Sequence, residues 1–541
     1  MEVGFFAKDL SLKETVYFQG KPVIYRVLAK IYWIIRGGNT MRANFPENLN
    51  DPNMRLGVVP IGALQLDPNC RDAKVKVLRA LQYIYQNKEL CDQALQLVGN
   101  AVNPQGEDAR KTGRPGMDYW QILVLASVRL GCNLTYDELH DLTYQHRALR
   151  IMLGFSDWDM GSDDCELFTW NRIRYNVSKL PVETLNQIND LVVDIGHKLV
   201  PDAPEVVRGD SFVVGLNIHY PIDRQQLGDG VRKVIQTCAV LAQEYGISGW
   251  RKHEYLMKQN RKFLKSLSLA SRSRQKNAKN RLVNLYREYF AFVEKILERG
   301  LTTMEALNQR QDLDLSPSTA YADLFYYMSA TEYMRELTMR RIVEHESVPN
   351  AQKLFSIFEP HAELINRGKI PQAIEFGHRV LVIEDSVGFI CHHEVMDIGM
   401  VDKDVLCRAM ENLQKRLGNK IRSASFDCGF HSPENQTRLA DIVSQPCLPV
   451  KGVKLARKQR EEASVAWHNA RDYHAGVESA IHGLRAGNGL DRCRDRGYDG
   501  YERYVALAML GRNLCTLGRI LMEQEFEGSH AAYTKRKAVN F

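Results

Sequence analysis

The sequence predicts an α/β protein in which a mixed sheet is interrupted by a helical insertion and preceded by an all-helical region. Strand-like, β-branched segments occur in two blocks, near residues 206–220 and 378–426. More than a hundred residues with helical periodicity separate the two blocks. A structureless gap of that length would be unusual inside a sheet, whereas a folded insertion is not. Residues from about 72 to 198 are also dominated by helical patterns.

Length and composition bound the class of protein. The chain has 541 residues, which favours about three or four domains. Hydrophobic residues make up 44% and charged residues 25%, so the bulk of the chain is globular rather than disordered or collagen-like. The formal net charge is only +7, so any nucleic-acid signal has to come from local clusters.

Cysteine usage and hydropathy predict a reduced, cytoplasmic protein without a membrane span. The 11 cysteines are odd in number and form no C-x-x-C pair, which argues against a disulfide scaffold and a zinc ribbon. Residues 23–35 are apolar, but Arg26 and Lys30 interrupt them. We therefore expect an amphipathic helix there, because a span needs about 20 mostly apolar residues.

Helix signals are clear in the first part of the chain. A helix over residues 119–130 is expected to begin after Asp118 and to end at Gly131. Thr135, followed three residues later by Glu138, has the spacing of a capping box and predicts the start of the next helix.

These helices belong to a predicted domain of residues 51–200, which follows an N-terminal extension of residues 1–50. Scattered arginines lie within the domain: Arg114, Arg129, Arg147, Arg150, Arg172 and Arg174. They could bind DNA or simply form solvated helix faces, and the sequence leaves both alternatives open.

The remaining elements are predicted in chain order. They are a strand over 206–214 ended by Gly215, a short strand over 216–220, helices to about residue 346 with Gly300 as a C-cap, a hairpin of 378–384 and 387–391, a helix over 402–417, a strand over 421–426, and helices over 477–484 and 501–521.

One segment is strongly basic. Eleven cations lie between residues 251 and 281: Arg251, Lys252, Lys258, Arg261, Lys262, Lys265, Arg272, Arg274, Lys276, Lys279 and Arg281. Glu254 is the only acid there, and Trp250, Tyr255 and Phe263 are interleaved. Solvated faces normally mix both signs of charge, so this run favours binding to a phosphate backbone.

Two smaller basic clusters follow the last predicted strand. The first contains Lys451, Lys454, Arg457, Lys458 and Arg460, and the second contains Arg492, Arg494 and Arg496. Three basic patches around one α/β domain predict an extended nucleic-acid track.

Three acids occupy distinctive positions. Asp210 lies in the middle of a predicted strand, where a charge is costly unless it is solvated or bound to a metal. Asp427 follows the strand over 421–426, and the carboxyl ends of sheet strands are where α/β sites are usually built. Glu478 lies on a helix whose apolar stripe packs on the core, so it can be aimed along the edge of that face.

Carboxylates of this kind suit Mg²⁺ or Mn²⁺ rather than zinc. Two such ions about 3.5–4 Å apart can clamp an in-line displacement at phosphorus. We therefore predict that Asp210, Asp427 and Glu478 hold two divalent ions, with the acids supplying geometry and charge.

Several ordered motifs resemble the DDE transposases of bacterial insertion sequences, most closely the group filed as "not classified yet" (ISNCY). They cover roughly residues 70–525 and lie at residues 113–124, 209–214, 219–223, 355–360, 367–369, 374–377, 427–432, 434–435, 477–481, 500–507 and 512–514.

The resemblance implies an RNase H-like catalytic domain, split between residues 201–223 and 374–525 by a mostly helical, basic insertion of residues 224–373, with a tail of residues 526–541. It implies Asp210, Asp427 and Glu478 as the DDE triad. Related transposases often carry a Tyr and an Arg seven and four residues before the Glu and a Lys seven after it; this chain has Arg471, His474 and Arg485 there.

Other residues compete for roles. Asp223 is an alternative first metal ligand, or merely the start of a helix, and Asn217 stands where relatives carry a second acid. The segment 391–394 invites a metal interpretation, but strand neighbours point to opposite faces, which favours structural or surface roles. His431 and Asn435 could touch DNA or stiffen a turn, and Trp467 is expected to pack in the core.

The sequence-level hypothesis is a DNA transposase that binds terminal inverted repeats, cleaves element ends and joins the 3′ ends to target DNA. Its partners would be double-stranded DNA and a second copy of the chain during synapsis. The expected DNA contacts are Arg251, Lys252, Lys258, Arg261, Lys262, Lys265, Lys451, Lys454, Arg471, His474, Arg485, Arg492 and Arg494. The alternatives are an RNase H-fold nuclease without strand transfer and a non-catalytic DNA-binding descendant.

Overall fold

The computed structural model describes residues 17–18, 21–22, 42–45, 58–103, 116–155, 168–310, 319–366 and 374–539. The expected helix over 23–35 and most of the extension 1–50 lie outside these residues. The chain divides into two compact units. We call residues 1–38 with 218–364 the insertion unit, and residues 39–217 with 365–541 the sheet unit.

The predicted mixed sheet is present and has seven strands. They are β3 (Val206–Leu216), β4 (Glu363–Asn366), β5 (Ile374–Asp385), β6 (Ile390–Val395), β7 (Ser423–Ser425), β8 (Gln445–Cys447) and β9 (Arg492–Cys493). The order is β4-β5-β3-β7-β8, with β6 also paired to β5 and β9 to β3. Pairing is antiparallel on the β5 side of β3 and parallel on its β7 side. A separate pair joins β1 (Tyr17–Phe18) to β2 (Lys21–Pro22).

Two strand predictions were wrong in detail. Gly215 does not end the first strand, because it pairs with Gly377 on one side and Arg492 on the other, so β3 continues to Leu216. The short strand expected over 216–220 is therefore absent, and residues 217–220 form an irregular connection. The hairpin is real, but its strands are longer or shifted to 374–385 and 390–395.

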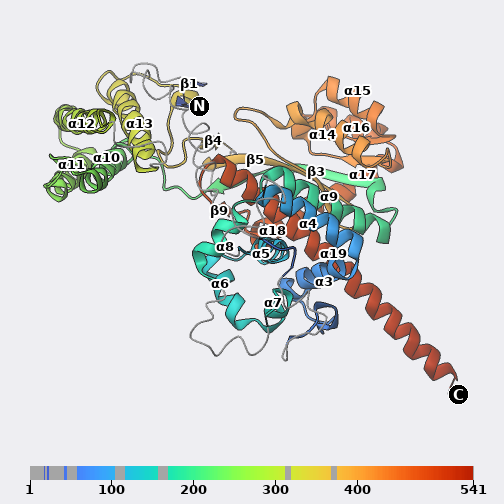
Figure 1. The fold of residues 1–541 in the computed structure, drawn as a ribbon. Coiled ribbons are helices and arrows are strands. Elements are labelled where there is room, and N and C mark those ends of the chain that lie inside the picture. Colours follow the sequence, from blue (N-terminus) through green and yellow to red (C-terminus); the bar gives the residue numbers. More distant parts are fainter. Residues whose placement is uncertain are drawn as a thin grey trace. The chain divides into compact units, whose positions relative to one another are not determined.

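Helices cover both faces of the sheet. Figure 1 shows α14 (Asp402–Arg416) and α15 (Pro433–Ile442) over one face, and α9 (Val182–Leu199), α18 (Val477–Asn488) and α19 (Tyr498–Val539) over the other. Two short helices, α16 (Val453–Glu462) and α17 (Val465–His474), connect β8 to α18.

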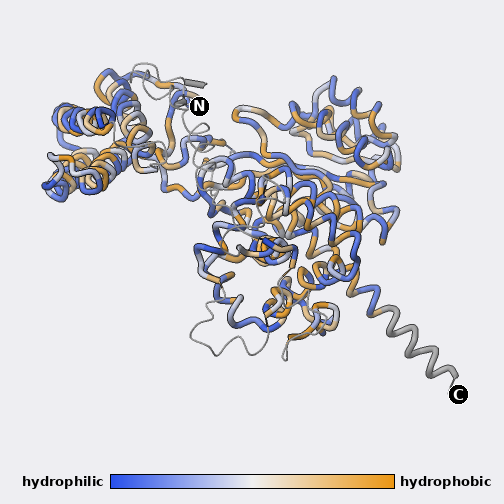
Figure 2. The backbone as a smooth tube through the Cα atoms, viewed as in Figure 1, coloured by the Kyte–Doolittle hydropathy of each residue, from blue (hydrophilic) through white to orange (hydrophobic). Residues whose placement is uncertain are grey.

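The helices expected before residue 200 belong to the same compact unit as the sheet. They are α3 (Ala73–Gln86), α4 (Lys88–Val102), α5 (Tyr119–Gly131), α6 (Tyr136–Gln145), α7 (Arg147–Met152), α8 (Trp170–Val177) and α9. α19 packs against α3, α5 and α9, and glycines permit the close crossings: a Cβ on Gly518 would overlap the Lys76 carbonyl. Hydrophobic residues concentrate along α5 and the first part of α19 (Figure 2).

The segment Tyr498–Phe526 of α19 has the length and hydropathy of a membrane span. However, 83% of its most apolar window is buried inside the protein, as in the core helix of a soluble protein.

The insertion unit is helical. α10 (Asp223–Tyr245), α11 (His253–Arg272), α12 (Ala278–Asn308) and α13 (Thr319–Ile342) share one apolar core. Gly300 is not a C-cap as expected, because α12 continues for eight residues beyond it, to Asn308. Its small size instead admits Met328 of α13, whose sulfur would lie 2.8 Å from a Cβ there.

One helix cap makes stability depend on pH. His146 begins α7 and accepts a hydrogen bond at Nδ1 from the Leu149 N–H, at 3.2 Å. Burial and the nearby Lys74 lower the pKa of His146. Because the unfolded chain binds the proton more readily, stability should fall as the pH drops below about 6.5, by up to about 1 kcal/mol for the lost cap.

His146→Asn keeps a capping oxygen but does not titrate in this range. Urea denaturation of both proteins at about pH 8 and about pH 5.5 measures the difference. We expect the wild-type protein to lose more unfolding free energy than the variant; equal losses would contradict the assignment.

Candidate active site

The pairing of β3 with β7 ends two residues before two of the three candidate acids. The strands run parallel in the register Val206↔Ser423, Val207↔Ala424 and Arg208↔Ser425. Continued by two residues, this register sets Asp427 beside Asp210. The strands stay close over that step, because a Cβ on Gly209 would overlap the Phe426 ring. Neighbouring strands lie about 4.8 Å apart, so this extended register would set the two carboxylates side by side.

The edge of β3 opens at this point. β7 ends at Ser425, and β9 begins to pair with β3 only at Gly215. Between these two pairings the chain turns away through the short 3₁₀ helix Cys428–Phe430, which Asp427 caps by accepting the Cys428 N–H at 2.7 Å. Asp210 and Asp427 therefore lie at a break in the sheet and remain half-buried rather than sealed in the core.

Two contacts place α18 along the same face of β3 as Asp210. At its start, a Cβ on Gly476 would overlap the Arg208 guanidinium. Near its end, the Arg485 guanidinium donates to the Val213 carbonyl at 3.1 Å and lies 5.6 Å from the Phe212 ring. Arg208, Asp210 and Phe212 alternate onto one face of the strand.

The two contacts also fix the direction of α18. Nine helical residues at about 1.5 Å each and four strand residues at about 3.3 Å each span nearly the same length, about 13 Å. α18 therefore runs alongside β3, with Asp210 between its two contacts. Val477, Ala480 and Leu484 are buried, whereas Glu478 is exposed in the first turn. Glu478 is thus on the helix that contacts the Asp210 face of β3, with its side chain exposed.

The three carboxylates are not collapsed into one tight cluster. Among the described residues, the group whose ligand atoms all lie within 4.8 Å of one another is His197, Asp385 and Cys391. A pair of ions about 4 Å apart, each bound at about 2.1 Å, spans up to about 8 Å between ligand oxygens, so a two-ion site needs no direct contact between carboxylates.

The donor set fits Mg²⁺ or Mn²⁺. All three candidate ligands are carboxylates, the donors that hard divalent ions prefer. Within the described part of the chain, no Lys or Arg forms an ion pair with Asp427 or Glu478, whereas Asp223 accepts two hydrogen bonds from Arg341 at 2.5 and 2.7 Å. Asp223, the alternative first ligand, is therefore already compensated at the start of α10.

Basic side chains and one histidine lie near Asp427. Burial and the neighbouring Arg471 lower the pKa of the His474 imidazole, which is buried and also faces Asp427. Arg471 Nη1 is buried without a hydrogen-bond partner. Lys451 and Arg471 both act electrostatically on Cys428, the residue after Asp427. Lys451 and Arg471 therefore supply positive charge near Asp427, whereas the lowered pKa of His474 favours its neutral form.

The other expected DNA contacts differ in availability. Lys451, Lys454 and Arg492 are exposed, whereas Arg485 is half-buried against β3. Arg494 is engaged within the protein, since its Nε donates to the Tyr504 hydroxyl at 2.9 Å and its Nη2 to Asn133. α16 has no buried residue, and Val453 at its start is 89% exposed.

In the insertion unit, all eleven cations between Arg251 and Arg281 are exposed. The interleaved aromatics do not share this surface. Trp250 is buried and donates to Thr303, and Phe263 packs on the core, so only Tyr255, at 58% exposure, is displayed with the cations.

The remaining candidates have structural surroundings. Asn435 donates to the carbonyls of Lys403 and Phe430 at 2.7 and 2.9 Å, which stiffens the turn after Asp427. Trp467 is half-buried rather than a full core residue as expected. His392 and Glu394 lie 3.7 Å apart on β6, and Glu394 also pairs with Arg408.

Sequence reasoning missed the cluster His197–Asp385–Cys391. Asp385 Oδ2 bonds His197 at 2.8 Å, and its Oδ1 accepts the N–H groups of Val387, Gly388 and Phe389. Burial raises the pKa of the Cys391 thiol, whose sulfur lies 3.6 Å from Asp385. The three side chains satisfy one another and tie the β5–β6 turn to α9. No local sequence pattern links residues so far apart.

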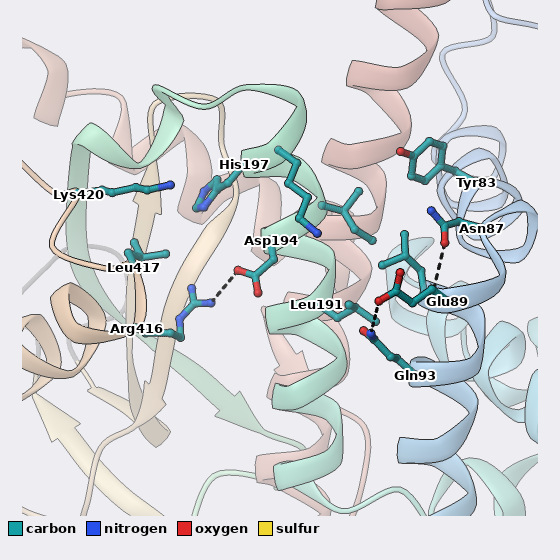
Figure 3. Close-up of a pocket in the computed structure, with 13 residues that line it drawn as sticks. Tyr83, Asn87, Glu89, Gln93, Leu191, Asp194, His197, Arg416, Leu417 and Lys420 are labelled. Carbon is teal, nitrogen blue, oxygen red and sulfur yellow. Dashed lines mark hydrogen bonds and ion pairs between the residues drawn. The ribbon is translucent and has the colours of Figure 1, made fainter.

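A cavity of about 450 Å³ lies elsewhere in the sheet unit, lined by α3, α4, α9 and the end of α14 (Figure 3). Of its lining residues, Arg416 contacts Asp194 at 3.7 Å, and the same guanidinium contacts Asp190, outside the lining, at 3.0 Å. None of the three candidate acids lines this cavity.

No family model, no curated protein and no solved structure matches the chain.

Proposed function

We propose that the protein is a DDE transposase of a bacterial insertion sequence, which cleaves DNA at the element ends and joins the 3′ ends to target DNA. The observation that carries the proposal is the β3–β7 register, which ends at Arg208 and Ser425 and, continued by two residues, would align Asp427 with Asp210 at a break in the sheet. The sequence motifs that resemble this family contain the same two residues, and they are independent of the strand pairing.

The sheet and its surroundings add support. The order β6-β5-β3-β7-β8, antiparallel on one side of β3 and parallel on the other, is the arrangement expected of an RNase H-like sheet. The insertion unit leaves the chain after β3, and α18, the helix of Glu478, begins beside Arg208 of β3. Two basic surfaces, on α11 and at the start of α16, are available for the DNA backbone.

Each group has a chemical role. Two divalent ions held by Asp210, Asp427 and Glu478 would supply Lewis-acid stabilisation of charge at the scissile phosphate. The carboxylates bind and space the ions, and the half-buried break in the sheet limits the number of competing waters. Arg471 and Lys451 attract the phosphate backbone on the Asp427 side. The joining step would need two ends together, so the active form would be at least a dimer.

Strand cleavage and joining test the proposal directly. Purified protein is incubated with Mg²⁺ and labelled DNA carrying the inverted repeats that flank the gene, with and without target DNA. Nicks at the repeat ends and labelled joined product are expected. Pre-cut ends with target DNA separate the alternatives, because a nuclease without strand transfer gives no joined product and a non-catalytic descendant gives neither product.

The basic face of α11 predicts salt-dependent binding. Lys258, Lys262 and Lys265 recur at helical spacing and are all exposed. A plot of log affinity against log salt concentration has a negative slope that grows with the number of phosphates contacted. Changing all three lysines to Gln should reduce the magnitude of this slope by about three if each contacts a phosphate. Filter binding or fluorescence anisotropy across a salt series measures the slope.

A matched triple controls for net charge. Lys198 and Lys420 line the cavity of Figure 3, and Lys88 lies between its lining residues Asn87 and Glu89 in the chain. All three lysines are exposed, and their change to Gln removes the same charge. That variant should keep nearly the wild-type slope. Equal slopes for the two triples would show that α11 makes no dedicated phosphate contacts.

A further inference from the structure

Arg208 links three elements next to Asp210. It precedes Asp210 by two residues and therefore shares its face of β3. Its Nε donates to Glu384 Oε1 of β5 at 2.5 Å, and its Nη1 donates to the Tyr473 carbonyl of α17 at 2.7 Å. The guanidinium also lies 4.4 Å from the Tyr473 ring. Arg208 is mostly buried, and Glu384 is 2% exposed.

The start of α18 rests on this guanidinium. Gly476 lies so close to Arg208 Nη1 that a Cβ would overlap it, and α18 begins at the next residue. The Tyr473 hydroxyl donates to the Asp385 carbonyl at 2.8 Å, which anchors the same segment to β5. The backbone two residues before Glu478 is thus fixed to the strand two residues before Asp210.

We infer that Arg208 is a positioning residue, which through Gly476 sets the distance between Glu478 and Asp210 that metal binding requires. The inference rests on the proposed function and deepens it. A purely structural ion pair would stabilise the unit without influencing metal affinity. Glu478 is exposed and has no other described tie to β3, so its place depends on where the α17–α18 junction is held.

The test removes the link without leaving a buried charge. Arg208→Gln alone would leave the buried Glu384 carboxylate without its counter-charge and would destabilise the unit. The informative variant is therefore Arg208→Gln with Glu384→Gln, which replaces the ion pair by neutral groups of similar size. Its melting temperature should stay close to that of the wild-type protein. Its affinity for Mn²⁺ and its rate of DNA cleavage at limiting Mg²⁺ should fall by about 10- to 100-fold.

Gly476→Ala provides an independent arm. In the wild-type background the added methyl group meets Arg208 and should weaken Mn²⁺ binding. In the Arg208→Gln/Glu384→Gln background the guanidinium is gone, so the same change should have little further effect. Such non-additivity is expected only if the two positions act through one contact.

Mn²⁺ titration of the full-length protein, followed by electron paramagnetic resonance, gives the Mn²⁺ affinity without requiring turnover. Binding that is lost in Asp427→Asn is assigned to the proposed site. A double variant that folds, binds Mn²⁺ as tightly as the wild-type protein and cleaves equally fast overturns the inference while leaving the proposed function intact. Wild-type protein with no Asp427-dependent Mn²⁺ binding and no cleavage overturns both.

Discussion

Changing Asp427 to Asn should abolish DNA cleavage and joining while leaving the fold and DNA binding in place. In the proposed site, the loss of one carboxylate would remove a negative metal ligand, and metal ions contribute several kcal/mol to stabilising charge at a reacting phosphate. At about 1.4 kcal/mol per tenfold change in rate, the expected loss is about 1,000-fold or more. Rates of nicking at labelled element ends, under single-turnover conditions with Mg²⁺, measure it.

The substitution is structurally mild. Asp427 caps the short helix Cys428–Phe430 by accepting the Cys428 N–H, and the Asn side-chain oxygen can accept the same bond. The basic surfaces on α11 and α16 are unchanged. Loss of activity should therefore come without loss of affinity for element ends, as measured at the same salt concentration.

Two further Asn variants sharpen the result. Asp441 is an exposed carboxylate on the nearby α15, and Asp441→Asn should cleave at the wild-type rate. Asp210→Asn should behave like Asp427→Asn, whereas Asp223→Asn should retain cleavage, because Asp223 pairs with Arg341 in the insertion unit. If Asp223→Asn is inactive and Asp210→Asn is active, Asp210 is not the first ligand.

The sequence was informative wherever a local pattern decides local structure. The capping box of Thr135 and Glu138 forms as predicted, with the Glu138 N–H donating to the Thr135 hydroxyl at 3.2 Å. Helix α14 begins at Asp402 as predicted, and α5 spans Tyr119–Gly131. These elements depend on neighbours within a few residues, so the sequence alone predicts where they begin and end.

Strand pairing and helix docking carry no such local signal. That β3 pairs with β7 across the insertion, in a register that would align Asp210 with Asp427 when continued by two residues, is decided by contacts 217 residues apart. Gly300 was predicted as a C-cap because glycine at the end of an apolar stripe is typical of one. A glycine is needed at this position because Met328 approaches closely. That approach depends on how α13 packs against α12, so the local sequence does not reveal it.

The candidate site shows the same division. Residue type and local context were sufficient to single out Asp210, Asp427 and Glu478. The contact between Gly476 and Arg208, which brings the helix of Glu478 to the strand of Asp210, could not be inferred from either segment alone.

Changing Arg129 to Met should cause the largest loss of stability. Arg129 lies in α5 at 1% exposure and forms a two-pronged ion pair with Asp495, at 2.9 and 2.6 Å. Its guanidinium also lies 3.7 Å from the Tyr136 ring. The variant leaves Asp495, which is only 11% exposed, without its counter-charge. Removing one partner of a buried pair typically costs about 3–5 kcal/mol.

The matched control removes both charges. Arg129→Met with Asp495→Leu eliminates the stranded carboxylate, so most of the lost stability should return, because replacing a whole buried pair by apolar groups is often close to neutral. Arg129→Lys should fall between the two, since lysine keeps the charge but cannot form the paired hydrogen bonds or stack on Tyr136 in the same way.

Hydrogen exchange of peptides from α5 and α19 reports on the sheet unit alone, which avoids averaging over a chain with two compact units. Protection of both helices should fall in Arg129→Met and recover in the double variant. Asp495 follows β9, and β9 pairs with the end of β3, so weakening this link should also loosen the strand that carries Asp210. Unchanged protection in the single variant would mean that the ion pair is not what holds α5 to the sheet.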